Sequence, residues 1–217
     1  MQPLGAVILV VLAYVAGSIP FGVLVARLTG APDPRLTGSG RTGGTNALRA
    51  MGRRRAALVV VGDILKGAAP VFLARWLSGG DPALEAACGV AAVVGSARSI
   101  FLGFHGGRGV ATGVGTMLVI QPLAVAIATP VFVLVILATR YVSLGSLIGS
   151  AAMVPAVALV FLVLNGTVPA AYLLYAVVGA AIVWIAHADN IERLLHGTER
   201  KFDLSLLSGR SGSGGAS

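Results

Sequence analysis

A short segment rich in glycine and arginine is the first place in this sequence where side chains and backbone together suit an anion. Residues 38–49 read Gly-Ser-Gly-Arg-Thr-Gly-Gly-Thr-Asn-Ala-Leu-Arg. Its glycines let the backbone approach a ligand closely, and successive exposed N–H groups form a concavity that binds anions. Ser39, Thr42 and Thr45 add hydroxyl groups. We expect Thr45 to cap a short helix that carries Arg49 one turn later, where a guanidinium can bind two phosphate oxygens. The alternative is a flexible loop whose arginines only set membrane topology.

A second segment, residues 104–112, reads Phe-His-Gly-Gly-Arg-Gly-Val-Ala-Thr. It places glycines and the cation Arg108 directly before a long apolar run, which is typical of an anion site at the start of a helix. The spacing and the Lys-Ser/Thr pair of a Walker loop are missing. A simple tight turn remains the alternative.

A third polar segment, residues 187–201, carries charges of alternating sign. The plain interpretation is a solvated helix at the membrane interface, with Leu194 and Leu195 on its membrane side. His187, at the end of the last apolar run, is either a buried hydrogen-bonding group or a general base.

Two charged residues, Asp63 and Lys66, lie inside an apolar run. Charges within a membrane span are costly and usually have a function. Their i,i+3 spacing lets them neutralise each other. A structural ion pair and a direct role in the site therefore both remain open.

The composition identifies the kind of scaffold that must position these residues. Of 217 residues, 56% are hydrophobic and 11% are charged, and the mean hydropathy is +0.90. A soluble domain has about 25% charged residues, so this chain is expected to be an all-α polytopic membrane protein. Its net charge of +8 points to membrane topology and not to nucleic acid. The single cysteine, Cys88, excludes an internal disulfide and a cysteine-built metal site, and we expect no metal and no cofactor.

Hydrophobic runs long enough to cross a membrane recur along the chain. They cover residues 4–26, 56–77, 83–102, 110–139, 142–164 and 168–186. The run 110–139 is too long for one ordinary span and is interrupted at Gln121-Pro122, so it is either one tilted helix or a hairpin. We expect a single membrane domain over residues 1–205 and a flexible Gly/Ser-rich cytoplasmic tail over residues 206–217.

The distribution of arginine decides between the two topologies. The loop at residues 27–55 is rich in arginine and should be cytoplasmic, which places the N-terminus outside. With a hairpin at residues 121–122, the basic C-terminal segment is also cytoplasmic, whereas a single helix would put it outside. We therefore predict seven transmembrane helices, with the N-terminus outside and the C-terminus in the cytoplasm. All three polar segments then face the cytoplasm.

Three classes of function fit clustered glycine, arginine and hydroxyl groups at one membrane face: an enzyme for a phosphorylated substrate, an anion transporter, and a scaffold. A transporter should show internal repeats with paired broken helices, and the two glycine segments differ in spacing and flanks. A scaffold does not need such a cluster. The residues favour the enzyme, with a membrane anion transporter as an alternative.

Taken together, the motifs resemble the bacterial acyl-phosphate:glycerol-3-phosphate acyltransferases, the PlsY family. The resemblance covers nearly the whole chain and rests on five elements in order. They are Gly-Ser-Ile-Pro-Phe-Gly at 17–22, Gly-Ser-Gly…Gly-x-Thr-Asn-x-x-Arg at 38–49, Asp-x-x-Lys-Gly at 63–67, Gly-Gly-x-Gly-Val-Ala-Thr at 106–112 and His-x-x-Asn-Ile-x-Arg-Leu…Gly-Thr-Glu at 187–199.

The resemblance implies a multi-pass protein of the bacterial cell membrane that transfers a fatty acyl group from acyl phosphate to the 1-hydroxyl of glycerol 3-phosphate. The product is lysophosphatidic acid for phospholipid synthesis, and the active site faces the cytoplasm, beside membrane lipid. The catalytic residues it implies are Ser39, Arg49, Arg108, His187 and Asn190. The substrate-binding residues it implies are Gly38, Gly40, Gly43, Thr45, Asn46, Lys66, Gly106, Gly107, Gly109, Thr112 and Glu199.

The residues agree with a reaction that needs little beyond positioning and charge neutralisation, because acyl phosphate is already activated. No His-x4-Asp pair is present, and no Ser-His-Asp triad can be assigned. We therefore expect no covalent acyl-enzyme. The resemblance implies that a substrate phosphate accepts the hydroxyl proton.

At several positions the sequence departs from the family pattern. Arg41, Gly44 and Arg108 stand where Asn, Ala and Lys are usual, and Gly95–Phe101, with Ser96, lacks the usual His and Pro. Arg108 can still bind phosphate, as a flat fork instead of a point charge. A divergent paralogue with altered substrate or lost catalysis is therefore the second hypothesis.

Overall fold

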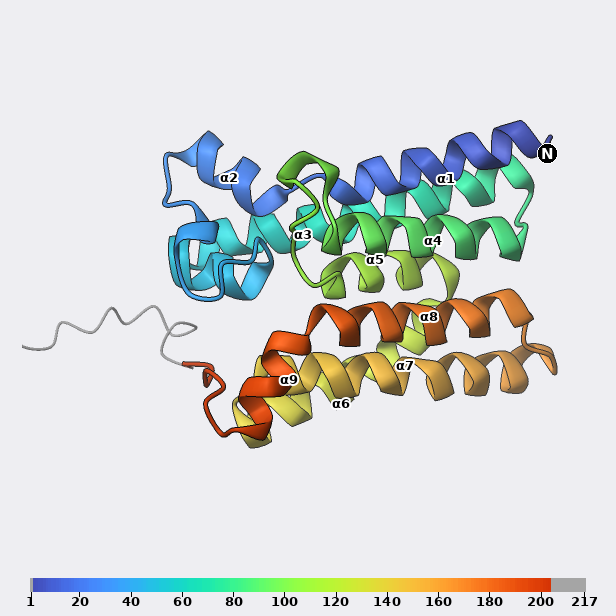
Figure 1. Cartoon of the computed structure of the whole chain (residues 1–217). Coiled ribbons are helices and arrows are strands. Elements are labelled where there is room, and N and C mark those ends of the chain that lie inside the picture. The colour runs from blue at the N-terminus through green and yellow to red at the C-terminus, as the bar shows by residue number, and fades with distance from the viewer. Residues whose placement is uncertain (1, 204–217) are drawn as a thin grey trace, which may run out of the picture.

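The apolar runs fold into helices, and glycines and prolines mark many of their ends. The computed structural model describes residues 2–203. This part of the chain consists of helices that are joined by turns and loops (Figure 1). The predicted tail at residues 206–217 lies outside the described residues. The α-helices are α1 (Pro3–Ser18), α2 (Phe21–Thr29), α3 (Gly44–Ser78), α4 (Pro82–Ala97), α5 (Val110–Ile120), α6 (Pro122–Thr139), α7 (Val142–Asn165), α8 (Ala170–Ala186) and α9 (Ala188–Leu195). Two short 3-10 turns are η1 (Pro34–Leu36) and η2 (Ile100–Leu102).

The first apolar run is not one continuous helix. It breaks between Ser18 and Phe21, and α1 and α2 are bent by 47°. The pyrrolidine ring of Pro20 cannot continue the helix, so α1 ends at Ser18, and the Ser18 and Ile19 carbonyl groups lack a helical N–H partner four residues on. Two side chains from other elements replace it: the Ser99 hydroxyl donates to the Ser18 carbonyl at 2.6 Å, and the Lys66 ammonium donates to the Ile19 carbonyl at 2.9 Å.

The second apolar run belongs to a helix that starts well before it. Helix α3 covers 35 residues and is kinked at Gly52, whose φ of 78° and ψ of 177° are not helical. Gly43 is the N-cap, and no side chain caps the helix. The expectation that Thr45 caps it is wrong: Thr45 lies inside the first turn, because the chain becomes helical two residues earlier than expected.

The break predicted at Gln121-Pro122 is confirmed. Gln121 has φ −153° and ψ 87° and separates α5 from α6. Pro122 opens α6, where its missing N–H costs nothing. Helix α5 has 11 residues and is therefore about 16 Å long, which is short for a membrane span.

By length and apolar composition, four described helices can cross a membrane, namely α3, α4 (extended to Leu102), α6 and α7. The number rises to six if the bent pairs α1–α2 and α8–α9 each count as one span. The structure therefore gives an all-helical membrane protein with four to six candidate spans. Seven spans, and the side on which each terminus lies, remain predictions.

Close backbone contact joins the helices that carry the polar segments. A Cβ atom at Gly67 on α3 would overlap the Thr112 carbonyl oxygen of α5, and one at Gly115 on α5 would overlap the Ile64 carbonyl oxygen of α3. Small residues let membrane helices approach in this way. The starts of α3 and α5 and the whole of α9 lie at one end of the bundle, on the left in Figure 1.

The opposite end of the bundle is held by a buried ionic network. The fully buried Glu85 carboxylate on α4 accepts hydrogen bonds from Arg75 of α3 at 3.0 and 2.6 Å and from the Tyr172 hydroxyl of α8 at 2.9 Å. Arg75 also donates to the Val119 carbonyl of α5 at 2.6 Å. The carboxylate joins α3, α4 and α8, and Arg75 adds α5; the buried charge is thereby paired and hydrogen-bonded.

Candidate active site

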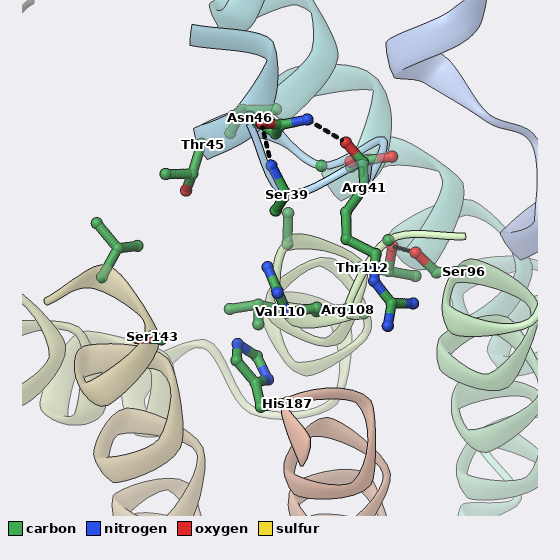
Figure 2. A pocket seen from close by; sticks show the side chains of 18 of the residues that line it. Ser39, Arg41, Thr45, Asn46, Ser96, Arg108, Val110, Thr112, Ser143 and His187 are labelled. Atoms are coloured by element: carbon green, nitrogen blue, oxygen red, sulfur yellow. Dashed lines mark hydrogen bonds between the residues drawn. The ribbon is translucent and has the colours of Figure 1, made fainter. Parts of the chain in front are cut away.

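The three polar segments of the sequence meet around one pocket of about 370 Å³ (Figure 2). Most of the predicted site residues line it: Ser39, Gly43, Thr45, Asn46, Arg49, Gly107, Arg108, Gly109, Thr112, His187, Asn190 and Glu199. Gly38, Gly40, Gly106 and Lys66 are not among the lining residues. The pocket lies between the start of α3, the start of α5 and the α8–α9 junction.

Asn46 organises the first glycine segment from inside. Its amide nitrogen donates to the carbonyl groups of Pro34, Thr37 and Arg41 at 2.6, 3.1 and 2.8 Å, and its amide oxygen accepts the Ser39 N–H at 3.2 Å. The buried amide therefore fixes the course of the whole loop. A Cβ at Gly38, where φ is 54°, would overlap the Asn46 oxygen, so this glycine shapes the loop.

Arg49 projects from the first turns of α3 to the pocket with Ser39 and Thr45. Its guanidinium makes no hydrogen bond within residues 2–203, while one turn earlier Asn46 is fully engaged. A half-buried arginine with free donors on a pocket wall is suited to an incoming anion.

The second glycine segment is fastened to the end of α4. The Gly107 N–H donates to the Ser96 carbonyl at 2.9 Å, and the Thr112 hydroxyl donates to the Ser96 hydroxyl at 3.0 Å. A Cβ at Gly106 would overlap that same carbonyl oxygen. Gly109, with φ 76°, is the N-cap of α5. Ser96, one of the departures from the family pattern, thus anchors the turn that presents Arg108.

Arg108 is the most buried of the arginines on the pocket wall. Its Nη2 donates to Asp189 Oδ2 at 3.0 Å, and its Nε is buried without a hydrogen-bond partner within the described residues. Burial lowers the pKa of the guanidinium below its ordinary value, Asp189 raises it, and nearby Arg41 lowers it further. Arginine nevertheless stays protonated in proteins, so the pocket holds a partly desolvated cation.

The third polar segment forms one wall of the pocket, which hydrogen bonds and ion pairs hold together. Only the first part of the segment is helical. Helix α9 ends at Leu195, and Leu195 is exposed. Glu199, beyond its end, accepts hydrogen bonds from Asn190 at 2.7 Å, Ser143 at 3.0 Å and Arg193 at 2.8 Å. Arg193 therefore pairs with both Asp189 and Glu199 within this segment, and Glu199 fixes Asn190 at the pocket.

His187 has one ring nitrogen committed to the backbone. Nδ1 lies 2.7 Å from the Val183 carbonyl oxygen, which can only accept, so Nδ1 carries the hydrogen. The side chain is buried at the α8–α9 junction and points to the pocket (Figure 2). Nε2 is then the nitrogen available to a ligand, and this orientation fits both hypotheses for His187.

Asp63 and Lys66 form a buried ion pair with 2.7 Å between Oδ1 and Nζ. Asp63 lines the pocket, whereas the Lys66 ammonium points to the break between α1 and α2 and binds the Ile19 carbonyl. The structure thus gives Lys66 a role in fixing the first span. It does not bring Lys66 to the pocket wall with the other predicted binding residues.

Several residues of the site are not predicted from the sequence. Asp189 binds Arg108, and its carboxylate oxygens also lie 3.2 Å from Arg193 Nη2 and 3.9 Å from Arg41 Nη2. The Asp189–Arg193 pair is visible as an i,i+4 spacing on α9. Ser143 is the second residue of the apolar run 142–164, and nothing in its local sequence indicates that it would meet Glu199.

A second, apolar pocket of about 400 Å³ continues from the first. Residues that line both are Val60, Ile64, Val110, Val114 and Phe132. On α8 its wall runs from Val183, one turn from His187, to Tyr175, about 12 Å away along the helix. A polar, arginine-rich chamber therefore opens into an apolar chamber between the helices.

Comparison with known proteins shows which family the chain is similar to. A family model described as glycerol-3-phosphate acyltransferase matches residues 7–197. A glycerol-3-phosphate acyltransferase of Rubrobacter xylanophilus is 48% identical over 209 residues, covering 96% of this chain and 98% of that protein. One of Geobacter sulfurreducens is 45% identical over 202 residues, covering 92% and 98%.

Two solved structures of PlsY, described as an integral membrane glycerol 3-phosphate acyltransferase, have the same fold. The glycerol 3-phosphate form has a TM-score of 0.84 and 36% identity, covering 95% of this chain and all of that one. The lysophosphatidic acid form has a TM-score of 0.81 and 35% identity, covering 94% and 99%. Sequence and fold thus match over almost the full length of the relatives, and the chain belongs to the glycerol-3-phosphate acyltransferase (PlsY) family.

Proposed function

We propose that this protein transfers a fatty acyl group from acyl phosphate to the 1-hydroxyl of glycerol 3-phosphate and forms lysophosphatidic acid. The hydroxyl oxygen bonds to the acyl carbonyl carbon, and the bond from that carbon to the phosphate oxygen breaks. Phosphate leaves and takes up the hydroxyl proton. The atoms balance without an enzyme nucleophile or a cofactor.

The observation that carries this proposal is the junction of two chambers with opposite chemistry. Among the described residues that line the polar chamber, four are arginines: Arg41, Arg49, Arg108 and Arg200. The acids on its wall are Asp63, which is paired with Lys66, and Glu199, which is bound by three donors. The surplus positive charge suits two phosphate groups, and the adjoining apolar chamber suits an acyl chain.

In this proposal the arginines hold the phosphates and neutralise the charge that develops on the leaving group. Arg49 and Arg108 are the principal cations, because both project to the pocket with free donors. Backbone N–H groups of the two glycine segments add neutral donors. Ser39, His187 and Asn190 orient the glycerol hydroxyl groups and the reacting carbonyl by hydrogen bonding.

The proposed topology has seven spans, with α5 as the short one, the N-terminus outside and the pocket at the cytoplasmic face. The arginine-rich segment at residues 27–55 supports it, since short cytoplasmic segments are enriched in Lys and Arg. The water-soluble acceptor then enters from the cytoplasm, while the acyl chain of the donor reaches the apolar chamber from membrane lipid.

The second candidate is a paralogue with altered substrate, and the departures at Arg41 and Arg108 favour it. Both guanidinium groups lie at the pocket, so they change the shape and charge offered to substrate. The two candidates predict different turnover with the same substrates.

Purified protein supplied with acyl phosphate and glycerol 3-phosphate tests the function. We expect equal amounts of lysophosphatidate and inorganic phosphate, and no turnover when acyl-CoA replaces acyl phosphate. Activity with acyl-CoA alone would overturn the proposed donor. A folded protein without turnover on either donor would favour the paralogue.

A further inference from the structure

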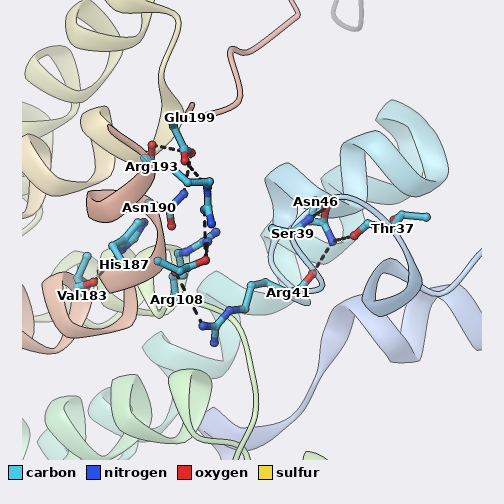
Figure 3. Close-up of polar contacts among 12 residues, drawn as sticks. Thr37, Ser39, Arg41, Asn46, Arg108, Val183, His187, Asn190, Arg193 and Glu199 are labelled. Carbon is cyan, nitrogen blue, oxygen red and sulfur yellow. Dashed lines mark hydrogen bonds and ion pairs between the residues drawn. The ribbon is translucent and has the colours of Figure 1, made fainter. Parts of the chain in front are cut away.

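The Asp189 carboxylate lies among three guanidinium groups that come from three separate elements. Figure 3 labels the three arginines, Arg41, Arg108 and Arg193. Oδ2 is 3.0 Å from Arg108 Nη2, in the loop before α5, and 3.2 Å from Arg193 Nη2, on α9. Oδ1 is 3.9 Å from Arg41 Nη2, in the loop before α3. Arg193 is also bound by Glu199 at 2.8 Å, so Asp189 is the counter-charge that remains for Arg41 and Arg108.

This counter-charge leaves part of the cluster unsatisfied. Arg108 Nε and Asp189 Oδ1 are both buried and have no hydrogen-bond partner within residues 2–203. Of the five N–H donors of Arg108, only one on Nη2 makes a hydrogen bond in this part of the chain, and Arg41 Nη2 is beyond hydrogen-bond distance of the carboxylate. A guanidinium and a carboxylate that are fully matched form two parallel hydrogen bonds, which is not the case here.

A phosphate group can satisfy the two arginines better than Asp189 does. Its oxygens are arranged as a tetrahedron, so different oxygens can accept from Arg41 and from Arg108 at once, whereas the planar carboxylate engages Arg108 through a single oxygen. Both arginines line the pocket, and the two loops that carry them are adjacent: a Cβ at Gly107 would lie 3.8 Å from the Gly43 nitrogen.

We propose that Asp189 is an internal counterion for Arg41 and Arg108. Between turnovers it holds the two guanidinium groups in place. It also competes with a phosphate dianion for them, so that product phosphate can leave. Asp189 is thus a positioning residue that tunes phosphate affinity through the two arginines. The proposal rests on the proposed function for the phosphate chemistry, but not on acyl transfer itself.

Removal of the charge of Asp189 should change the affinity for phosphate in opposite directions, depending on whether Asp189 competes with phosphate or only holds Arg108 in place. If Asp189 competes with phosphate, Asp189→Asn frees both guanidinium groups and tightens phosphate binding. If Asp189 only holds Arg108 in place, the same change loosens the arginine and weakens binding. The two cases are therefore separable by the direction of one dissociation constant.

The experiment measures the Kd of inorganic phosphate from the rise in Tm with phosphate concentration, using the purified full chain in detergent. We expect Asp189→Asn to lower the Kd by about tenfold, equivalent to about 1.4 kcal/mol. Asp189→Glu should stay near the unchanged protein. Glu192→Gln, which removes an exposed carboxylate from the same helix, should change the Kd by less than about twofold, because exposed charges are screened. An unchanged or higher Kd in Asp189→Asn would overturn the proposal.

A second arm identifies the route of the effect and the phosphate concerned. In an Arg41→Gln/Arg108→Gln background, Asp189→Asn should no longer tighten binding, since coupled residues give non-additive effects. Persistent tightening there would show that the arginines are not the link and would overturn the proposal. Repeating the titration with glycerol 3-phosphate distinguishes the acceptor phosphate from the product phosphate. The proposal requires that Asp189→Asn lower the Kd of at least one of the two compounds. No donor substrate is present, so a negative acyl-transfer assay leaves this test intact.

Discussion

At the scale of single residues, the site is a set of cations whose hydrogen-bonding capacity is only partly used. Asn46 and Glu199 have their polar groups largely occupied by the protein, and they hold neighbouring groups in place. Arg49 and Arg108 keep donors free beside the pocket. Asn46 and Glu199 thus build the site, and Arg49 and Arg108 are the side chains that we propose bind substrate.

Arg49→Ala should lower kcat/KM by roughly tenfold to a few hundredfold, because a charge-assisted hydrogen bond contributes about 1.5–3 kcal/mol. Steady-state kinetics with glycerol 3-phosphate measure this loss. Unchanged kinetics in a folded variant would remove Arg49 from the phosphate site. Arg53, which lies beyond the kink at Gly52 and is exposed, provides a matched control as Arg53→Ala.

Arg108→Lys should keep substantial activity, because a cation remains near the phosphate, whereas Arg108→Ala should lose most of it. The comparison of the two variants separates the effect of losing the positive charge from the effect of changing the side chain. Full activity of Arg108→Ala would reduce Gly106–Gly109 to a turn without a role in binding. If the unchanged protein proves inactive, recovery of turnover in Arg41→Asn/Arg108→Lys would identify it as a drifted paralogue.

At the scale of helices, the broken first span shows how a buried ion pair and the site are connected. Lys66 ties the Ile19 carbonyl to α3, and Ser99 ties the Ser18 carbonyl to the segment after α4. The following helix, α2, packs so closely on the first glycine loop that a Cβ at Gly22 would overlap the Thr42 carbonyl oxygen. The position of that loop therefore depends on the break.

Lys66→Met should destabilise the protein by about 3–5 kcal/mol, since Asp63 is left as an uncompensated buried charge. Asp63→Asn/Lys66→Met should recover much of that stability, which thermal unfolding in detergent can measure. If the double variant retains acyl transfer, Lys66 acts through structure. A stable double variant without activity, despite normal phosphate binding, would show that the Asp63–Lys66 pair acts in the reaction and not only in the structure.

The local sequence predicts many of these elements. It fails where residues that are distant in the chain determine the structure. Gln121-Pro122 marks a break that chain chemistry alone imposes, and the break is present. The break at Pro20 was missed because the surrounding run is apolar enough for one span, and its stabilising partners, Lys66 and Ser99, lie far along the chain. The motif residues that line the pocket are predicted from their resemblance to one family, whereas Ser143 reaches Glu199 only through folding.

At the scale of the whole molecule, the pocket lies at one end of a bundle whose sides carry large exposed apolar residues. Leu58, Phe72, Leu134 and Leu162, on α3, α6 and α7, are all more than half exposed. Exposed apolar surface of this extent on long helices belongs against lipid. The polar end of the bundle then defines the membrane face from which soluble substrate arrives.

Cysteine labelling tests the proposed topology of that bundle. In a Cys88→Ala background, cysteines at Gly80 and Gly166 should react from outside, and one at Arg53 only from the cytoplasmic side. Both glycines lie in exposed turns, and the native Cys88 is buried. Labelling at Gly166 from the cytoplasmic side would contradict seven spans and would separate the third polar segment from the other two.

The ionic network at the far end of the bundle also bears on how the chain enters the membrane. Under the proposed topology, Arg75 near the end of α3 and Glu85 near the start of α4 must both cross the apolar layer, and only a short turn separates the two helices. Crossing as single charges is costly, whereas a hairpin in which they are already paired carries no net charge at that point. We therefore expect α3 and α4 to insert together, as one unit, with this ion pair formed during translocation.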